Sequence, residues 1–221
     1  YSPITRFTAI LPLYYPVHGK RTLAKLGWLD EESVRQARLL RQGAATATGE
    51  LNYPLQPLQC PAATQAPPNV LWILIDALRP DAIDPATSPR LAAFRAGGQS
   101  FANHWSGGNS SRMGLFSMYY GLPSTYWQAF YDTQRPPVLL DEFRRRDYTL
   151  MTSSAVGYGS PTLIDRTVFA GVPGLKPESS ASGVEKNRAV TADWLAWLRA
   201  RQETSPFFAF LYYDPPFTGG D

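Results

Sequence analysis

"NVLWILIDALRPD", residues 69–81, decides the fold class of this chain. An unbroken apolar run from Val70 to Ile75 is typical of a buried strand, and it ends on the carboxylate of Asp76. Because an unpaired charge is costly to bury, Asp76 is expected to meet a ligand or a local partner. In a parallel sheet the functional crevice lies beyond the carboxyl ends of the strands, where a metal or another ligand would bind. The alternative is that Asp76 only caps the following turn.

The composition excludes several classes of protein. The 221 residues are 44% hydrophobic, and their net charge of +3 is too small to indicate a nucleic-acid partner. A single cysteine, Cys60, rules out an internal disulfide and Cys-based zinc motifs, and two histidines leave little for a His-rich metal site. With no leader and no apolar run of about 18 residues, we expect a piece excised from a longer protein.

The chain changes character near residue 66. Residues 1–65 contain spaced prolines, a stretch that predicts a short helical hairpin, and a proline-rich connector, whereas apolar runs alternate with helical patterns in residues 66–221. This alternation predicts an α/β fold with a mainly parallel sheet flanked by helices. The expected strands are 69–76, 99–104, 148–155 and 207–213, and the expected helices are 88–97, 110–121, 137–146 and 184–202.

The helix expected over 184–202 has the clearest periodicity. Its apolar residues at helical spacing are Val190, Trp194, Trp197 and Leu198. Such a stripe indicates a face packed against a core, and we assign these tryptophans to packing and not to ligand binding.

"SGGNSSRMGLFSMYYGLP", residues 106–123, is the second segment that suggests chemistry. Two glycines precede a helix whose N-cap is Asn109 or Ser110. The helix N-terminus favours an anion, and a nearby divalent metal could activate the Ser110 hydroxyl toward phosphate or sulfate esters. Arg112 could clamp a tetrahedral anion. The alternatives are simple capping by the serine and a solvated arginine.

An apolar strand that ends in Asp76 is followed, about 30 residues later, by a glycine-rich turn and a helix that begins at Ser110. This arrangement resembles that of the alkaline phosphatase and sulfatase superfamily. The resemblance implies that Asp76 is a metal ligand, that Ser110 is the nucleophile and that Arg112 takes the place of the signature arginine. Many sulfatases carry paired Asp residues at the strand end, whereas Ala77 follows Asp76 here, and the modified-cysteine nucleophile is absent. Phosphoester chemistry is therefore expected more than sulfatase activity.

Several motifs in the same order give a closer resemblance, which covers nearly all of the chain. They are "LPLYYPVHGKRTLAKLGWLD", "LNYPLQPL", "NVLWILIDAL", "SGGNSSRMGLFSMYYG" and "FFAFLYYD". They resemble the part of YejM/PbgA family proteins that faces the periplasm of Gram-negative bacteria. The resemblance implies a sulfatase-like domain that follows membrane helices, with a juxtamembrane segment in residues 1–65. It also implies a role in sensing lipopolysaccharide and in regulating its synthesis through a membrane-protein partner of a proteolysis pathway. Cardiolipin transport is a further proposal for the family.

Basic residues near the start of the chain match the lipid-contacting segment of that family. In "YPVHGKRTLAK" they are Lys20 and Arg21, with Lys25 one turn further on. Basic side chains near an anionic bilayer gain about 1 kcal/mol each, and arginine can bind a phosphate with two hydrogen bonds. The resemblance therefore favours lipid A or another anionic lipid as the ligand, over an ordinary solvated helix start.

The far end of the sequence limits the enzymatic interpretation. Asp214 follows the last predicted strand, and we interpret it as a turn carboxylate. The only histidines are His18, interpreted as a loop residue, and His104, expected at a strand end. The resemblance implies one divalent cation, Mg or Mn, in an intact domain, and none is expected in this piece.

Three hypotheses remain open at this point. The chain is a lipid A sensor that uses Lys20 and Arg21, a metal-dependent phosphoesterase or headgroup transferase that uses Ser110, or a module that docks another envelope protein. We favour the sensor, with the phosphoesterase second.

Overall fold

The computed structural model describes residues 51–60, 66–176, 181, 183–202 and 205–215. These residues form two compact units. The first unit contains residues 51–58, Ser106–Leu139 and Arg166–Gly171. The second unit contains the described residues of Gln59–Trp105 and Leu140–Asp165 and those that follow from Val172. The domain boundary predicted near residue 66 stays a prediction.

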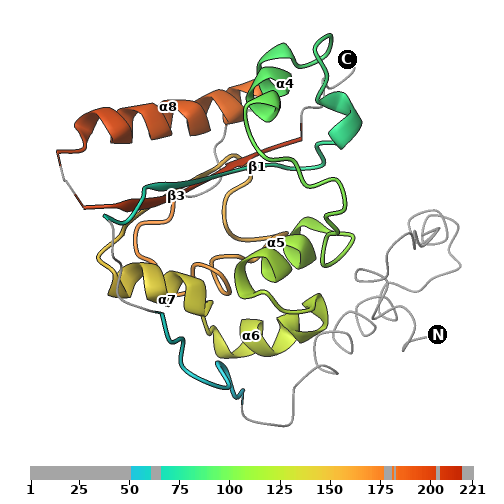
Figure 1. The fold of residues 1–221 in the computed structure, drawn as a ribbon. Coiled ribbons are helices and arrows are strands. Elements are labelled where there is room, and N and C mark those ends of the chain that lie inside the picture. The colour runs from blue at the N-terminus through green and yellow to red at the C-terminus, as the bar shows by residue number, and fades with distance from the viewer. Residues whose placement is uncertain (1–50, 61–65, 177–180, 182, 203–204, 216–221) are drawn as a thin grey trace, which may run out of the picture. The chain divides into compact units, whose positions relative to one another are not determined.

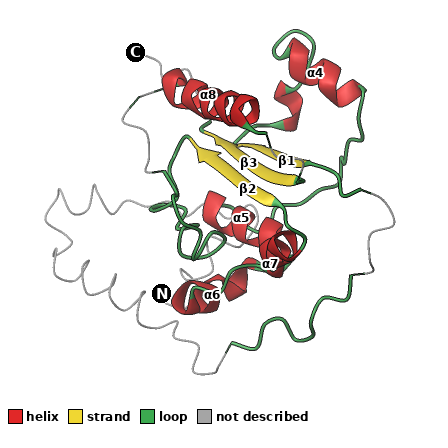
Figure 2. Ribbon diagram, turned by 90° about the vertical axis from the view of Figure 1, so that its left-hand side faces the viewer, coloured by secondary structure: helices red, strands yellow, loops and turns green. Residues whose placement is uncertain are grey.

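The second unit is built on a parallel sheet of three strands in the order β1-β3-β2 (Figures 1 and 2). The strands are β1 (Val70–Ile75), β2 (Thr149–Ser154) and β3 (Phe207–Tyr213). Both pairings are parallel, so the α/β fold and the parallel sheet are confirmed. The likeness to sulfatases and the juxtamembrane segment stay predictions.

Helix α8 (Val184–Ala200) covers one face of this sheet (Figure 1). Alternate residues of β3, namely Phe207, Ala209 and Leu211, point to this face because successive side chains of a strand point to opposite sides. They form a core with Met151, Ala155 and Val190, against which Trp194 and Trp197 pack.

The apolar stripe predicted on α8 is therefore correct for three of its four residues. Leu198 was expected in the core but is 42% exposed. The stacked rings of Trp194 and Trp197 occupy the helix face beside Phe207, with ring centroids 5.6 and 5.4 Å from that phenylalanine. One position further along the helix, Leu198 turns away from the sheet.

The opposite face of the sheet carries the other residues of β3: Phe208, Phe210 and Tyr212, all fully buried. Helix α7 (Val138–Arg145) contributes to its cover, since Phe143 stacks on Phe208 with ring centroids 4.5 Å apart. The central strand is thus buried on both faces, as its continuous apolar sequence predicts.

Strand β1 differs from the expectation of a fully buried strand. Its residues Leu71 and Ile73 are 39% and 57% exposed. In the described sheet β1 is an edge strand, and α8 makes its main sheet contacts with β3 and β2. An apolar run alone does not show whether both faces of a strand are covered.

The segment after β1 contains a 3-10 helix, η1 (Pro80–Ala82), and helix α4 (Pro89–Ala96). The helix expected over 88–97 is thereby confirmed. The strand expected over 99–104 is wrong, because these residues form a loop in which Phe101 is 77% exposed. His104 consequently lies in an exposed loop and not at the end of a strand.

The first unit contains helix α5 (Ser111–Tyr120), the 3-10 helix η2 (Ser124–Tyr126) and helix α6 (Trp127–Thr133). An aromatic cluster forms its core: the rings of Phe116, Tyr120 and Phe130 pack together, and Tyr53 packs on the last two of them. Helix α6 was not predicted.

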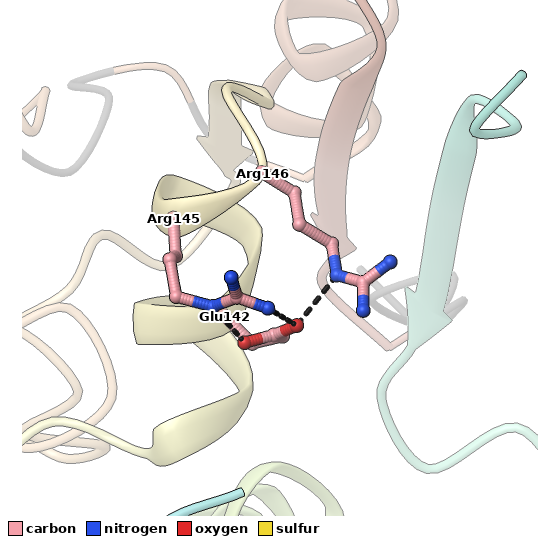
Figure 3. A network of polar contacts seen from close by, with 3 residues as sticks. All are labelled: Glu142, Arg145 and Arg146. Carbon is pink, nitrogen blue, oxygen red and sulfur yellow. Dashed lines mark hydrogen bonds and ion pairs between the residues drawn. The ribbon is translucent and has the colours of Figure 1, made fainter. Parts of the chain in front are cut away.

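An ionic network lies at the C-terminal end of α7 (Figure 3). Glu142 accepts two hydrogen bonds of 2.7 Å from Arg145 and one of 2.5 Å from Arg146. These bonds, that of Arg145 first, lower the pKa of Glu142 from 4.5 to about 2. Basic residues in the last turn of a helix also interact favourably with its dipole.

Candidate functional site

Asp76 follows β1 directly and is held by hydrogen bonds within the second unit. Its amide donates to the carbonyl of Tyr213 (3.0 Å), which extends the β1–β3 pairing by one residue. Its Oδ1 accepts from the amide of Ala77 (2.9 Å), and its Oδ2 accepts from the hydroxyl of Tyr212 (3.0 Å). The local turn contact that the sequence left open is therefore present, together with a second contact from β3. A ligand-binding role for Asp76 stays a prediction.

Asp214 ends β3 as Asp76 ends β1. Its amide donates to Oδ1 of Asn187 (2.8 Å), and its carbonyl accepts from Nδ2 of the same residue (3.3 Å). A side chain of α8 thereby holds the carboxyl end of β3. Both hydrogen bonds involve the main chain of Asp214, so the turn role predicted for its carboxylate stays a prediction.

Ser110, one of the two candidates that the sequence left open, occupies the N-cap position of α5. Its backbone is extended (φ −141°, ψ 152°), and its carbonyl accepts from the amides of Met113 (3.0 Å) and Gly114 (2.9 Å). Its side chain is exposed and makes no capping hydrogen bond. The simple alternative, in which the serine hydroxyl serves as the cap, is not realised. The hydroxyl stands where the dipole of the helix favours an anion.

The glycine loop before Ser110 is held closely against α5. A Cβ atom added to Gly107 would lie 1.8 Å from Oγ of Ser117, so no side chain fits there without a shift. The hydroxyl of Ser124 donates to the carbonyl of Gly107 (2.6 Å), and that of Ser106 donates to the carbonyl of Gly108 (2.7 Å). The absence of a side chain at Gly107 is thus a packing requirement.

Arg112 is half-buried and not simply solvated. Its guanidinium carbon lies 4.7 Å from the ring centroid of Trp127, and burial lowers the pKa of the group. The Trp127 ring stacks on Tyr131, with centroids 4.8 Å apart. On Tyr131 lies a second guanidinium, that of Arg166, which also donates to the tyrosine hydroxyl (2.9 Å). The anion-clamp role of Arg112 stays a prediction, but its orientation is fixed by an aromatic ring.

The residues predicted to form one site belong to different units. Ser110 and Arg112 are in the first unit, and Asp76 is in the second. Their convergence on a shared cleft stays a prediction. Sequence reasoning missed Tyr212, which contacts Asp76, Trp127, which contacts Arg112, and Ser124, which contacts Gly107 in the loop before Ser110. The sequence "YYGLPSTYW", residues 119–127, contains no pattern that predicts the contacts of Ser124 and Trp127.

A divalent cation needs more ligand side chains than the described residues bring together. They contain no group of three or more His, Cys, Asp or Glu side chains arranged to hold a metal ion. Asp76 offers one carboxylate, and each of its oxygens already accepts a hydrogen bond. The described part of the chain therefore does not fit a complete Mg or Mn centre.

The predicted lipid-binding residues Lys20, Arg21 and Lys25 lie outside the described residues. Among the residues that are described, none of the helices is both long and apolar enough to cross a bilayer.

Comparison with known proteins identifies homologues of this chain. Residues 1–60 match a domain of unknown function, DUF3413. The chain is 30% identical over 217 residues to the inner membrane protein YejM of Salmonella typhimurium, an alignment that covers 97% of the chain and 35% of YejM. This chain is a homologue of the YejM inner membrane proteins. The YejM of Salmonella typhi is 31% identical over 216 residues, which are 96% of the chain and 35% of that protein.

An uncharacterized protein of Haemophilus influenzae is also similar, with 30% identity over 211 residues, 96% of the chain and 35% of the relative. The family resemblance predicted from the motifs is confirmed by these YejM homologues. The chain spans only about a third of the length of the relatives that it matches.

Proposed function

We propose that this chain is the periplasmic part of a Gram-negative inner-membrane protein that senses lipopolysaccharide through lipid A. In this role it regulates lipopolysaccharide synthesis and the lipid balance of the outer membrane, through a membrane-protein partner of a proteolysis pathway. The observation that carries the proposal is the similarity to YejM inner membrane proteins along 96–97% of the chain.

The proposed contact residues are Lys20, Arg21 and Lys25. They lie within the region that matches DUF3413. Lipid A presents phosphate groups at a membrane surface. Arginine binds a phosphate through two parallel hydrogen bonds, and each basic residue near an anionic surface adds about 1 kcal/mol. Three basic residues so close together in the sequence suit a phosphorylated glycolipid better than a neutral one.

The test is binding of the full-length protein to vesicles with and without lipid A. The double variant Lys20→Ala/Arg21→Ala should lose about thirtyfold in affinity, which corresponds to about 1 kcal/mol for each of the two basic residues removed. The matched control is Arg90→Ala/Arg199→Ala, which removes the same charge from two exposed positions. Retained lipid A binding in the Lys20/Arg21 variant would contradict the sensor proposal.

A second function, a phosphoesterase or headgroup transferase with Ser110 as nucleophile, is favoured by one observation. The Ser110 hydroxyl is exposed at the start of α5 and does not serve as the cap. In the proposed step the Oγ–phosphorus bond forms as the phosphorus–oxygen bond to the alcohol breaks, and the serine proton ends on the departing alcohol. A water molecule then hydrolyses the phosphoserine, or a second alcohol accepts the group.

Hydrolysis of an aryl phosphate by the full-length protein, with Mg or Mn supplied, tests this second function. Ser110→Ala should abolish the activity, because it removes the attacking oxygen. Thr125→Ala, which removes an exposed hydroxyl in the same unit, should leave it unchanged. Equal rates for Ser110→Ala and the parent would exclude this mechanism.

A further inference from the structure

The segment formed by η2 and α6 contacts Gly107, in the loop that presents Ser110, and Arg112, in the first turn of α5. Ser124 is 4% exposed, and its hydroxyl donates a 2.6 Å hydrogen bond to the carbonyl of Gly107, 17 positions earlier in the chain. On its other side the loop rests on Ser117 of α5, where even a methyl group at Gly107 would overlap. The loop is therefore held from two sides, and Ser124 supplies a directional contact.

One turn after Ser124, the same segment supports Arg112. The Trp127 side chain is buried, and the guanidinium carbon of Arg112 lies over its ring, 4.7 Å from the centroid, in a cation–π contact. Stacking on Tyr131 fixes the indole, and Arg166 completes the far end of the stack. Such a stack limits the directions in which the N–H groups of Arg112 can point. An arginine restricted in this way loses less side-chain entropy when it binds an anion.

We infer that Ser124 and Trp127 are positioning residues that hold the Gly107 loop and Arg112 in the arrangement required by an oxyanion bound at Ser110. The inference rests on the phosphoesterase proposal and names the class of ligand, a phosphate or a phosphomonoester. The charged side chains of this stack, Arg112 and Arg166, are both cationic, which agrees with an anionic ligand. Neither Ser124 nor Trp127 needs to touch the ligand.

The experiment measures inorganic phosphate binding to the full-length protein by calorimetry, together with amide hydrogen exchange of residues 107–110. Ser124→Ala should weaken phosphate binding at least fivefold and speed exchange in the loop. Ser124→Thr, which keeps the hydroxyl, should restore both values to within about twofold of the parent. The matched control is Thr133→Ala, because Thr133 also donates a hydroxyl hydrogen bond to a backbone carbonyl (Ala129, 2.8 Å) in the same unit.

The contact between Trp127 and Arg112 is tested by the same measurement of phosphate binding. Trp127→Leu should weaken phosphate binding to the same extent as Arg112→Gln, and the double variant should be no weaker than either single one, since both act through the same guanidinium. Trp127→Phe keeps an aromatic face and should retain most of the affinity.

The outcomes separate this inference from the function on which it rests. If the parent binds phosphate but Ser124→Ala and Trp127→Leu bind it as tightly, the positioning role is wrong and the phosphoesterase proposal stands. If the parent binds no phosphate, the phosphoesterase proposal and the positioning role of Ser124 and Trp127 are both wrong. If binding is lost in Ser124→Ala and not restored by Ser124→Thr, the effect is general unfolding and the positioning role is again wrong.

Discussion

The hydroxyl of Tyr212 donates a 3.0 Å hydrogen bond to Oδ2 of Asp76, although the two residues are 136 positions apart in the chain. Tyr212 is fully buried in β3, and the parallel register places it opposite Leu74, two residues before Asp76. A carboxylate at the end of an edge strand is thereby oriented by the central strand.

We expect Tyr212→Phe to lower the free energy of unfolding by about 1 to 2 kcal/mol, because a hydrogen bond to a part-buried carboxyl group is lost at constant packing. Urea unfolding would measure the change. Tyr213→Phe is the matched control, since its hydroxyl makes an exposed contact with Thr191, and it should cost less than about 0.5 kcal/mol. Equal losses in the two variants would contradict the assigned contact.

Gly107→Ala should destabilise the first unit by about 1 to 3 kcal/mol, the usual cost of forcing an extra carbon into a packed site. The added methyl group would meet the side chain of Ser117 at 1.8 Å. Thermal unfolding would show the loss, and the second change Ser117→Gly should recover part of it by removing the obstructing atoms. Gly98→Ala is the control, because its nearest neighbour would be at an ordinary 3.7 Å. A Gly107→Ala protein as stable as Gly98→Ala would refute the close packing.

Glu142 should make the stability of the protein depend on acid pH. Its folded-state pKa of about 2 lies below the usual 4.5, so the unfolded state takes up the proton first as the pH falls. The stabilisation is present above pH 4.5 and is lost between 4.5 and about 2. In Glu142→Gln this part of the acid dependence should disappear, as measured by urea unfolding at a series of pH values.

The control for Glu142 is Glu185→Gln, which removes an exposed carboxylate that pairs with Arg188 on α8. It should leave the acid dependence of unfolding between pH 4.5 and 2 close to that of the parent. Added salt should reduce the effect of Glu142 only partly, because hydrogen-bonded pairs in close contact are screened less than distant charges. An unchanged acid profile in Glu142→Gln would argue against the network of Figure 3.

Tyr158 should give a corresponding dependence at alkaline pH. Burial raises its pKa from 10.0 to about 12, and the hydrogen bond with Thr152 opposes this shift. The unfolded state therefore loses its proton first, so the contribution of Tyr158 to stability is present below pH 10 and is lost as the pH rises from 10 to 12. Tyr158→Phe should flatten the unfolding profile in this range, whereas Tyr126→Phe, at an exposed position, should not. Identical alkaline profiles for Tyr158→Phe and the parent would contradict the assigned burial.

The elements with the strongest sequence patterns were predicted to within one or two residues. The continuous apolar run of 207–213 became β3 with the same bounds, and the long amphipathic pattern of 184–202 became α8 over Val184–Ala200. The start of α5 was also predicted, because a glycine pair followed by Asn and Ser is a strong start signal. In each case a local pattern agrees with the final packing.

The errors arise where packing between distant segments decides the structure. Helix α6 is short and rich in aromatic residues with modest helix propensity, and its Phe130 is held by Tyr53, far away in the sequence. The segment 99–104 was predicted to be a strand, but the described residues form no ladder with it. A segment with some strand propensity forms a strand only where a neighbouring strand pairs with it.

The candidate site was predicted in its individual residues but not in their contacts. Asp76 and Ser110 were found from their positions at the end of a strand and the start of a helix. Tyr212 reaches Asp76 only through the register of β1 and β3, and Trp127 reaches Arg112 only through the packing of α6 on α5. Neither register nor helix packing can be read from a single sequence without knowing which elements are neighbours.

The paired hydrogen bonds between Asn187 and the backbone of Asp214 have a mechanical consequence. Because Asn187 of α8 both donates to and accepts from the backbone of Asp214, the first turn of α8 and the end of β3 are coupled and should move together. Any displacement of the chain where β3 ends must either carry the first turns of α8 with it or break two bonds at once.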